Sequence, residues 1–159
     1  MEFIVKKYYN IEGMIRNGFK LSRDYHSLDF SYAKISDDAM LALAKSRSVK
    51  QVRRLIITGK KLTAISAQAL AESNCLPNLE SLKLYKNKIG DEGVKYLAET
   101  DKLPNIKTFR FAWNDIGPEG ARSLAESSQL GGLTSLALSE NHIGDDGLKY
   151  LAEAKSFSN

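Results

Sequence analysis

The chain has 159 residues, enough for one domain with a buried core. Hydrophobic residues make up 43% and charged residues 26%, as in soluble globular proteins, and no apolar run approaches the ~20 residues that a membrane-spanning helix needs. The net charge of +4 is too balanced for a nucleic-acid-binding arm or a polybasic membrane patch. A single cysteine, Cys75, excludes an internal disulfide framework and favours a cytoplasmic location.

The first 24 residues are predicted to contain one amphipathic helix. Apolar residues recur at helical spacing and form one face, made of Ile11, Met14, Ile15 and Phe19. Asn10 stands where an N-cap is expected, and Asn17-Gly18 stands where the helix is expected to stop.

From residue 25 onward, a 27-residue pattern repeats five times without an insertion or deletion. The repeats span residues 25–51, 52–78, 79–105, 106–132 and 133–159. Column four of the alignment is apolar, with Leu28, Leu55, Leu82, Phe109 and Leu136. Column nineteen is leucine throughout, at Leu43, Leu70, Leu97, Leu124 and Leu151. A unit of this length cannot bury its own apolar face, so the repeat predicts a stack whose units share one core.

Within each repeat, the pattern predicts a strand, a turn, a helix and a loop. Columns one to eight alternate apolar and polar residues, as in Leu79 to Lys86, which is typical of a short strand. Apolar residues then recur at helical spacing. We expect Asp91 and Asp145 to be helix N-caps, and Pro118 to lie in the first turn of its helix.

The two ends of such a stack differ in sequence. Residues 1–24 lack the repeat pattern and are predicted to be an N-terminal cap over the open end of the core, since solenoids need capping units. Strand 133–138 is the last of the series, and no polar cap sequence follows it. We therefore expect this C-terminal edge to leave backbone groups unpaired, which makes it a potential pairing site.

The pattern L-x-x-L-x-L-x-x-N-x-I-G, as it runs from Leu79 to Gly90, resembles the leucine-rich repeats of the ribonuclease-inhibitor type. The resemblance covers residues 25–159. It implies a right-handed α/β solenoid, with a parallel sheet on the concave face and helices on the convex face.

The resemblance also implies an asparagine ladder in column nine. The residues that match are Asn87, Asn114 and Asn141. In this family their side-chain amides satisfy backbone groups of the loops. Ala33 and Lys60 occupy the same column in the first two repeats, so we expect those turns to be satisfied in another way.

Catalytic chemistry finds no support in the sequence. His26 and His142 stand four repeats apart, about 19 Å at the usual strand spacing, so they cannot share a metal ion or a proton. Cys75 lies in a different column from either histidine, and no nucleophile–base arrangement can be assembled. We therefore expect no enzyme activity, no metal site and no cofactor.

The predicted register places columns three, five, seven and eight on the exposed sheet face. In the three middle strands these columns bring together Arg54, Lys83, Lys86, Arg110, Tyr85 and Trp113. Asp29 and Glu140 flank this basic and aromatic centre on the outer strands. Trp, Tyr and Arg are enriched at binding hot spots, which favours a binding site. The alternative is that these are ordinary solvated side chains that pair across strands.

The sequence therefore predicts a non-enzymatic protein–protein interaction module that binds a protein or peptide with acidic groups on its concave face. The alternative is a structural unit that self-associates weakly through its C-terminal edge. No membrane partner is expected. Nucleic acid is disfavoured because one helical column is acidic, with Glu72, Glu99, Glu126 and Glu153.

Overall fold

The computed structural model describes residues 10–22 and 24–154. In this part of the chain, five parallel strands form one sheet in chain order. The strands are β1 (Ser27–Asp29), β2 (Arg54–Ile56), β3 (Ser81–Lys83), β4 (Thr108–Arg110) and β5 (Ser135–Ala137). The helices are α2 (Ile11–Ser22), α3 (Asp37–Lys45), α4 (Ala64–Ala71), α5 (Gly90–Glu99), α6 (Pro118–Ala125) and α7 (Gly144–Ala152), with a 3-10 turn η1 (Arg47–Val49) after α3.

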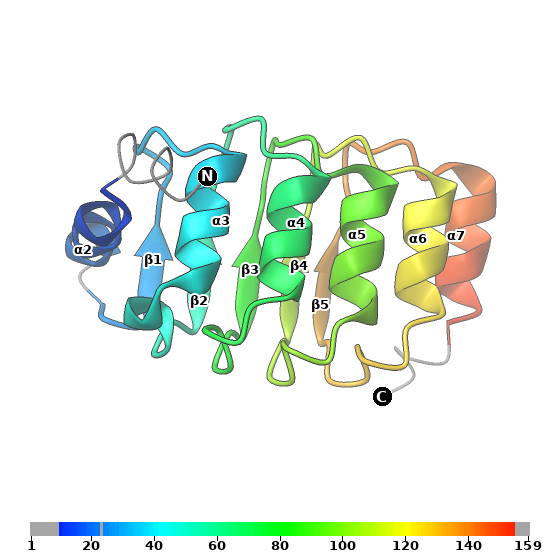
Figure 1. The fold of residues 1–159 in the computed structure, drawn as a ribbon. Coiled ribbons are helices and arrows are strands. Elements are labelled where there is room, and N and C mark those ends of the chain that lie inside the picture. The colour runs from blue at the N-terminus through cyan, green and yellow to red at the C-terminus, as the bar shows by residue number, and fades with distance from the viewer. Residues whose placement is uncertain (1–9, 23, 155–159) are drawn as a thin grey trace.

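Neighbouring strands pair residues that are 27 positions apart in sequence. Leu28 stands opposite Leu55, and Leu82 opposite Phe109. Helices α3 to α7 all lie on the same side of the sheet (Figure 1), so one face is covered and the other is open. The predicted α/β solenoid is confirmed.

The strands are shorter than the sequence predicts. Only columns three to five pair as strands, and β5 covers Ser135–Ala137 rather than 133–138. Backbone hydrogen bonds between repeats continue after the strands, as from Ile57 N to Lys83 O, and at column eight the backbone of four repeats is left-handed. The residues with positive φ there are Gly59, Lys86, Trp113 and Glu140.

The core is a row of apolar columns between the sheet and the helices. Leu28, Leu55, Leu82 and Phe109 are fully buried, and Phe109 stacks on Phe111 with ring centroids 4.7 Å apart. The same columns in the last repeat are less well covered. Leu136, Leu138 and Leu151 are only partly buried.

Helix α2 packs against β1 at one end of the sheet (Figure 1). Asn10 is the N-cap that the sequence predicts, because its Oδ1 accepts a hydrogen bond from Gly13 N at 2.9 Å. The predicted stop at Asn17-Gly18 is wrong, since the helix continues to Ser22. A Cβ on Gly18 would lie 3.0 Å from a methyl carbon of Leu28, so this glycine allows close packing rather than ending the helix. Residues 1–9 and 23 of the predicted cap lie outside the described residues.

The asparagine ladder connects each of the last three repeats to the one before it. Asn87 Oδ1 accepts from the backbone N–H of Lys60 and Leu62, at 3.0 and 3.1 Å, and its Nδ2 donates to Ile57 O. Asn141 makes equivalent contacts, with Oδ1 accepting from Asn114 N and Ile116 N. Among the described residues, Asn114 Oδ1 accepts only from Ile89 N, at 3.4 Å, and its Nδ2 donates to Leu84 O. In the second repeat, Lys60 takes over part of this role, because its ammonium donates to Ser31 O at 2.7 Å.

At the start of α4 and of α6, an acidic side chain from the preceding repeat accepts a hydrogen bond from the N-cap backbone. The sequence predicts Asp91 and Asp145 to be N-caps. This prediction is wrong, because α5 and α7 already begin at Gly90 and Gly144. Asp91 instead accepts a hydrogen bond of 2.6 Å from the N–H of Gly117, the N-cap of α6. Pro118 is the first residue of α6, as expected. In the same way, Asp37 accepts from the N–H of Thr63, the N-cap of α4.

None of the helices in the described residues is both long enough and apolar enough to cross a membrane.

Candidate functional site

Two cations lie side by side in the middle of the open sheet face. Lys83 on β3 stands directly opposite Arg110 on β4. Ile56 and Ala137 flank this pair in the same row, on β2 and β5. Adjacent parallel strands are ~4.8 Å apart, so the two positive side chains leave the sheet as close neighbours.

This pair has no acidic partner within the described residues. The ion pairs found there involve neither Lys83 nor Arg110, nor Lys86 at the rim. Like charges directly opposite each other destabilise a sheet. The pair therefore does not help the fold, and it leaves the centre of the face positive toward any approaching ligand.

Arg54 is the exception among the predicted basic residues. It lies in a different row, opposite Ser81, and its guanidinium pairs with Asp24 and donates to Ser27 Oγ at 2.7 Å. The pKa of Asp24 is lowered, first by the hydrogen bond from His26 N and then by Ser27 and Arg54. Arg54 is thus already engaged, and it does not join Lys83 and Arg110 as a free cation.

Two aromatic side chains follow strands β3 and β4 at the rim of the face. Tyr85 is 43% exposed and Trp113 is 48% exposed. The backbone of Trp113 is held on both sides, because its N–H donates to Ser139 O at 3.1 Å and its carbonyl accepts from Asn87 N at 3.0 Å. The ring–ring stacking seen in the described residues joins Phe109 and Phe111, so the faces of Tyr85 and Trp113 are not used by an aromatic pair.

The two acidic flanks differ in how they are held. Asp29 accepts a hydrogen bond of 2.8 Å from Ser31 N, which fixes the turn after β1. Glu140 is exposed at the opposite rim. The carboxylates therefore sit at the outer strands, as the sequence predicts, and the basic centre lies between them.

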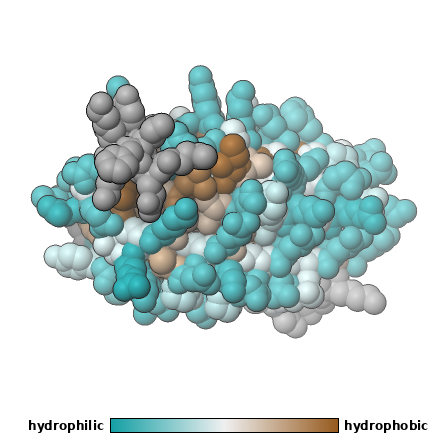
Figure 2. Space-filling view, viewed as in Figure 1, coloured by the Kyte–Doolittle hydropathy of each residue, from teal (hydrophilic) through white to brown (hydrophobic). Residues whose placement is uncertain are grey.

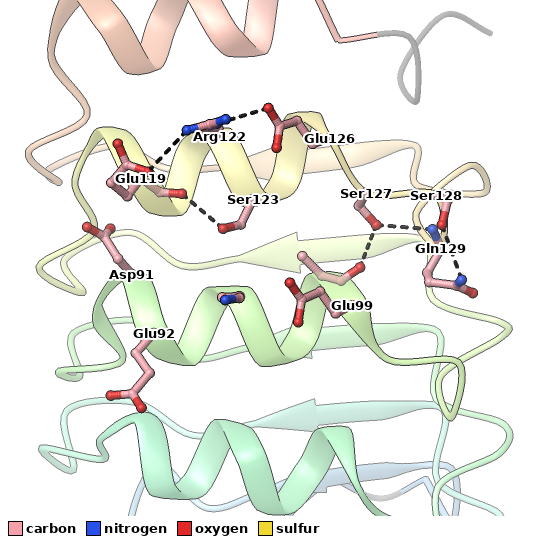
Figure 3. A pocket seen from close by; sticks show the side chains of 12 residues that line it. Asp91, Glu92, Glu99, Glu119, Arg122, Ser123, Glu126, Ser127, Ser128 and Gln129 are labelled. Atoms are coloured by element: carbon pink, nitrogen blue, oxygen red, sulfur yellow. Dashed lines mark hydrogen bonds and ion pairs between the residues drawn. The ribbon is translucent and has the colours of Figure 1, made fainter.

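The helical face has the opposite charge. Figure 2 shows hydrophilic side chains over most of it, with an apolar area in the part where α3 and α4 lie. The exposed large hydrophobic residues of these two helices are Leu41 and Ile65. A shallow groove between α5 and α6 is lined by carboxylates (Figure 3). These are Asp91, Glu92, Glu99, Glu119 and Glu126. Arg122 in this groove is already paired with Glu126 at 2.9 Å and Glu119 at 3.9 Å.

The histidines and the cysteine do not form a reactive site in the described structure. His26 and His142 are exposed in the first and last repeats, and Cys75 is a free, partly buried thiol. Within residues 10–22 and 24–154, no group of three or more His, Cys, Asp or Glu side chains is arranged to hold a metal ion.

A family model described as Leucine Rich repeat matches residues 26–44, 75–98, 102–125 and 133–152, together more than half of the chain. The chain belongs to the leucine-rich repeat family. This finding agrees with the resemblance seen in the repeat columns. No curated protein sequence matches the chain.

Solved structures show the same leucine-rich repeat fold. The tropomodulin C-terminal domain of Caenorhabditis elegans is similar with a TM-score of 0.66 and 14% identity, and the match covers 94% of this chain and 93% of that one. A chain of the yeast Rad7 and Elc1 complex is similar with a TM-score of 0.61 and 18% identity. That match covers 92% of this chain and 33% of the yeast chain. Identities this low show a shared fold alone.

Proposed function

We propose that this leucine-rich repeat chain is a non-enzymatic protein-interaction module that binds an acidic segment of a protein or a peptide on its concave face. The observation that carries the proposal is the uncompensated pair of Lys83 and Arg110 beside two half-exposed aromatic side chains. The family supports the general role of protein interaction. One of the structural neighbours is a chain of the yeast Rad7 and Elc1 complex, a structure that contains two different proteins.

The basic and the aromatic residues of the concave face would contact different groups of the partner. Lys83 and Arg110 would pair with carboxylates of the partner, while Trp113 and Tyr85 would contact its apolar side chains. Lys86 adds a third cation at the rim. Arg54 would contribute only at the margin, or after leaving Asp24, because that carboxylate already holds it.

The size of the face limits the partner. Five strands at ~4.8 Å give a sheet about 24 Å wide, and the strands are short. The open face is therefore a few hundred Å², below the ~800 Å² per partner of a standard interface. A peptide or a protruding loop fits this area. A larger partner would also have to contact the rim near Lys88, Asp115 and His142.

Selection of binders from a displayed random-peptide library, with the purified chain as bait, tests the proposal. We expect enriched peptides that combine Asp or Glu with an aromatic or aliphatic residue. Their affinity, measured by calorimetry, should fall as salt is raised, because exposed charge pairs are screened. Trp113→Ala should weaken binding by about 2 kcal/mol, roughly 30-fold, if Trp113 is a hot spot.

Matched controls lie on the helical face. Ile65→Ala removes an exposed apolar side chain from α4, and Lys95→Ala removes an exposed cation from α5. Neither should change the affinity, whereas Arg110→Ala should lower it. Binding that is indifferent to salt and to Trp113 would place the site elsewhere and contradict the proposal.

A further inference from the structure

The loops that lead from each strand to the following helix lie along one edge of the stack, at the top of Figure 1. Columns eight and ten of the repeat belong to these loops. Column eight holds Tyr32, Gly59, Lys86, Trp113 and Glu140, and column ten holds Lys34, Lys61, Lys88, Asp115 and His142. In both columns the charge changes sign once along the stack, from lysine in the first three repeats to carboxylate in the last two.

The charged side chains of these two columns are exposed in repeats two to five. We call Lys61, Lys86, Lys88, Asp115 and Glu140 the charged rim. All five are exposed, and none takes part in an ion pair found among the described residues. Lys60, in the column between, differs because its ammonium donates a hydrogen bond to Ser31 O. The charges of the rim are therefore available to a partner.

The backbone of this rim is left-handed at positions that do not hold glycine. Among the described residues, positive φ occurs outside glycine at Lys61, Lys86, Trp113, Asp115 and Glu140. Four of these belong to the charged rim, and the fifth is Trp113. Gly59 adopts the same conformation in column eight without strain. Strained residues of this kind gather at binding sites, so the side chains at these positions are candidates for recognition.

Hydrogen bonds between neighbouring repeats hold the rim in a fixed order. Lys86 N donates to Ala112 O at 2.9 Å, and Lys88 N donates to Leu62 O at 2.7 Å. Such a surface loses little conformational freedom on binding. Lys61 and Glu140 lie three repeats apart, or about 14 Å at ~4.8 Å per strand. An extended segment of about four to five residues spans this length at ~3.3 Å per residue.

We propose that the charged rim binds a mixed-charge segment of the partner, with acidic residues at one end and basic residues at the other. The inference rests on the proposed binding of an acidic segment, and it adds the requirement for basic residues. The acidic end pairs with the lysines of repeats two and three, and the basic end pairs with Asp115 and Glu140. Trp113 stands between Lys86 and Glu140 in column eight, so an apolar residue in the middle of the segment contacts its ring.

The order of charges favours this partner over a uniformly anionic one. A nucleic acid or an all-acidic peptide that covers the whole rim would place negative groups against Asp115 and Glu140, and like charges across an interface are unfavourable. A mixed-charge segment meets opposite charges at both ends. The order of charges also fixes which end of the segment lies over which repeat.

An exchange of two charges tests the rim without changing the net charge. The variant combines Lys61→Asp with Asp115→Lys. Each of these residue types already occupies column ten in the other repeat, with φ of 59° at Lys61 and 56° at Asp115, so the fold accommodates the exchange. The matched control combines Lys95→Glu with Glu99→Lys, which exchanges two exposed charges of α5 on the helical face.

The probes are two synthetic peptides measured by calorimetry at low salt. The mixed-charge peptide has two glutamates, two leucines and two lysines in that order, and the second peptide has serines in place of the lysines. Wild-type protein should bind the mixed-charge peptide at least about 3-fold more tightly than the serine peptide. The exchange in the rim should weaken binding of the mixed-charge peptide at least about 5-fold, and the control exchange should leave it unchanged. A nitroxide label on the glutamate end should broaden the amide resonance of Lys61 more than that of Glu140.

Arg110→Ala separates this inference from the proposed function. Loss of affinity in Arg110→Ala, with no effect of the rim exchange, overturns the mixed-charge partner and leaves the acidic-segment site standing. The reverse result supports the rim and contradicts the role of the sheet centre. Absence of binding by either peptide at millimolar concentration contradicts both. Equal affinity for the two peptides, or tighter binding of an oligodeoxythymidylate than of the mixed-charge peptide, also overturns the proposal.

Discussion

Trp113 combines a bulky side chain with a backbone conformation that does not favour one. Column eight has a left-handed backbone in four repeats, including Gly59 with φ of 67° and Trp113 with φ of 59°. Glycine adopts this conformation freely, whereas an L-residue with a bulky side chain does not. The fold therefore does not require tryptophan at this position, and its half-exposed ring is compatible with the proposed binding role.

This argument predicts an inverted order of stability. In most positions alanine is more stabilising than glycine, but at Trp113 the left-handed backbone reverses the preference. We expect Trp113→Gly to be more stable than Trp113→Ala by about 0.5–1 kcal/mol in urea titrations. Tyr85, one column earlier in the neighbouring repeat, has no positive φ and is the control, for which alanine should be the more stable variant. The same order at both positions would show that no strain is present at Trp113.

The basic centre could be predicted from the sequence only in part. A strict 27-residue register was enough to place Lys83 and Arg110 opposite each other, because strand pairing keeps that register. The pairing of Arg54 with Asp24 was not foreseen. Asp24 precedes the first repeat, so no column of the alignment predicts where its carboxylate lies.

At the scale of the elements, neighbouring repeats are joined by two series of side-chain hydrogen bonds, an asparagine ladder and a hydroxyl ladder. The sequence predicted only the asparagine ladder. The asparagine ladder was predictable because its column is visible. A second ladder uses hydroxyl groups that donate to carbonyls of the preceding repeat, namely Ser73 to Ala44, Thr100 to Ala71 and Ser127 to Ala98. Serine and threonine at helix ends are common in capping roles, so their column alone does not indicate contacts between repeats.

Helix α2 completes the hydroxyl ladder at its N-terminal end. Ser46 stands in the ladder column of the first repeat, and its hydroxyl donates to Glu12 Oε1 at 2.6 Å. Ser48 donates to the other oxygen of Glu12, also at 2.6 Å. The predicted break at Gly18 would have left α2 shorter, but packing against β1 overrides the weak helix preference of glycine.

Glu12 should make the attachment of α2 depend on pH. Hydrogen bonds from Ser46 and then Ser48 lower its pKa in the folded protein. The stabilisation is therefore complete above the ordinary carboxyl pKa of ~4.3 and is lost as the pH falls through the lower folded-state pKa. We expect Glu12→Gln to reduce the unfolding free energy at pH 7 by about 0.5–1 kcal/mol, a modest value because the carboxylate is exposed.

Urea titrations of Glu12→Gln at several pH values check this expectation. The difference from wild type should shrink as the pH falls below 4, since protonation removes the same charge from the wild-type side chain. Glu92→Gln on α5 is the control, because no hydrogen bond or ion pair is found for this exposed side chain among the described residues. A difference that stays constant down to acidic pH would show that Glu12 does not act through its charge.

On the scale of the whole molecule, the stack is asymmetric along its axis. Its N-terminal end is covered by α2, and every middle repeat is packed between two neighbours. The last repeat has a neighbour on one side only within the described residues, which explains the partial exposure of Leu136 and Leu151. The two faces of the whole stack also differ in charge, because the sheet has a basic centre and the groove between α5 and α6 is acidic.

This asymmetry predicts that the same substitution has a different effect in different repeats. Leu97→Ala removes a fully buried side chain from α5, where α4 and α6 on either side prevent the cavity from collapsing. It should cost about 2–5 kcal/mol of unfolding free energy. Leu151→Ala makes the same change in the same column of α7, where the side chain is partly exposed and the end of the stack can relax, so its cost should not exceed about 2 kcal/mol. Urea titrations measure both values, and equal costs would mean that the last repeat is as tightly packed as the middle one.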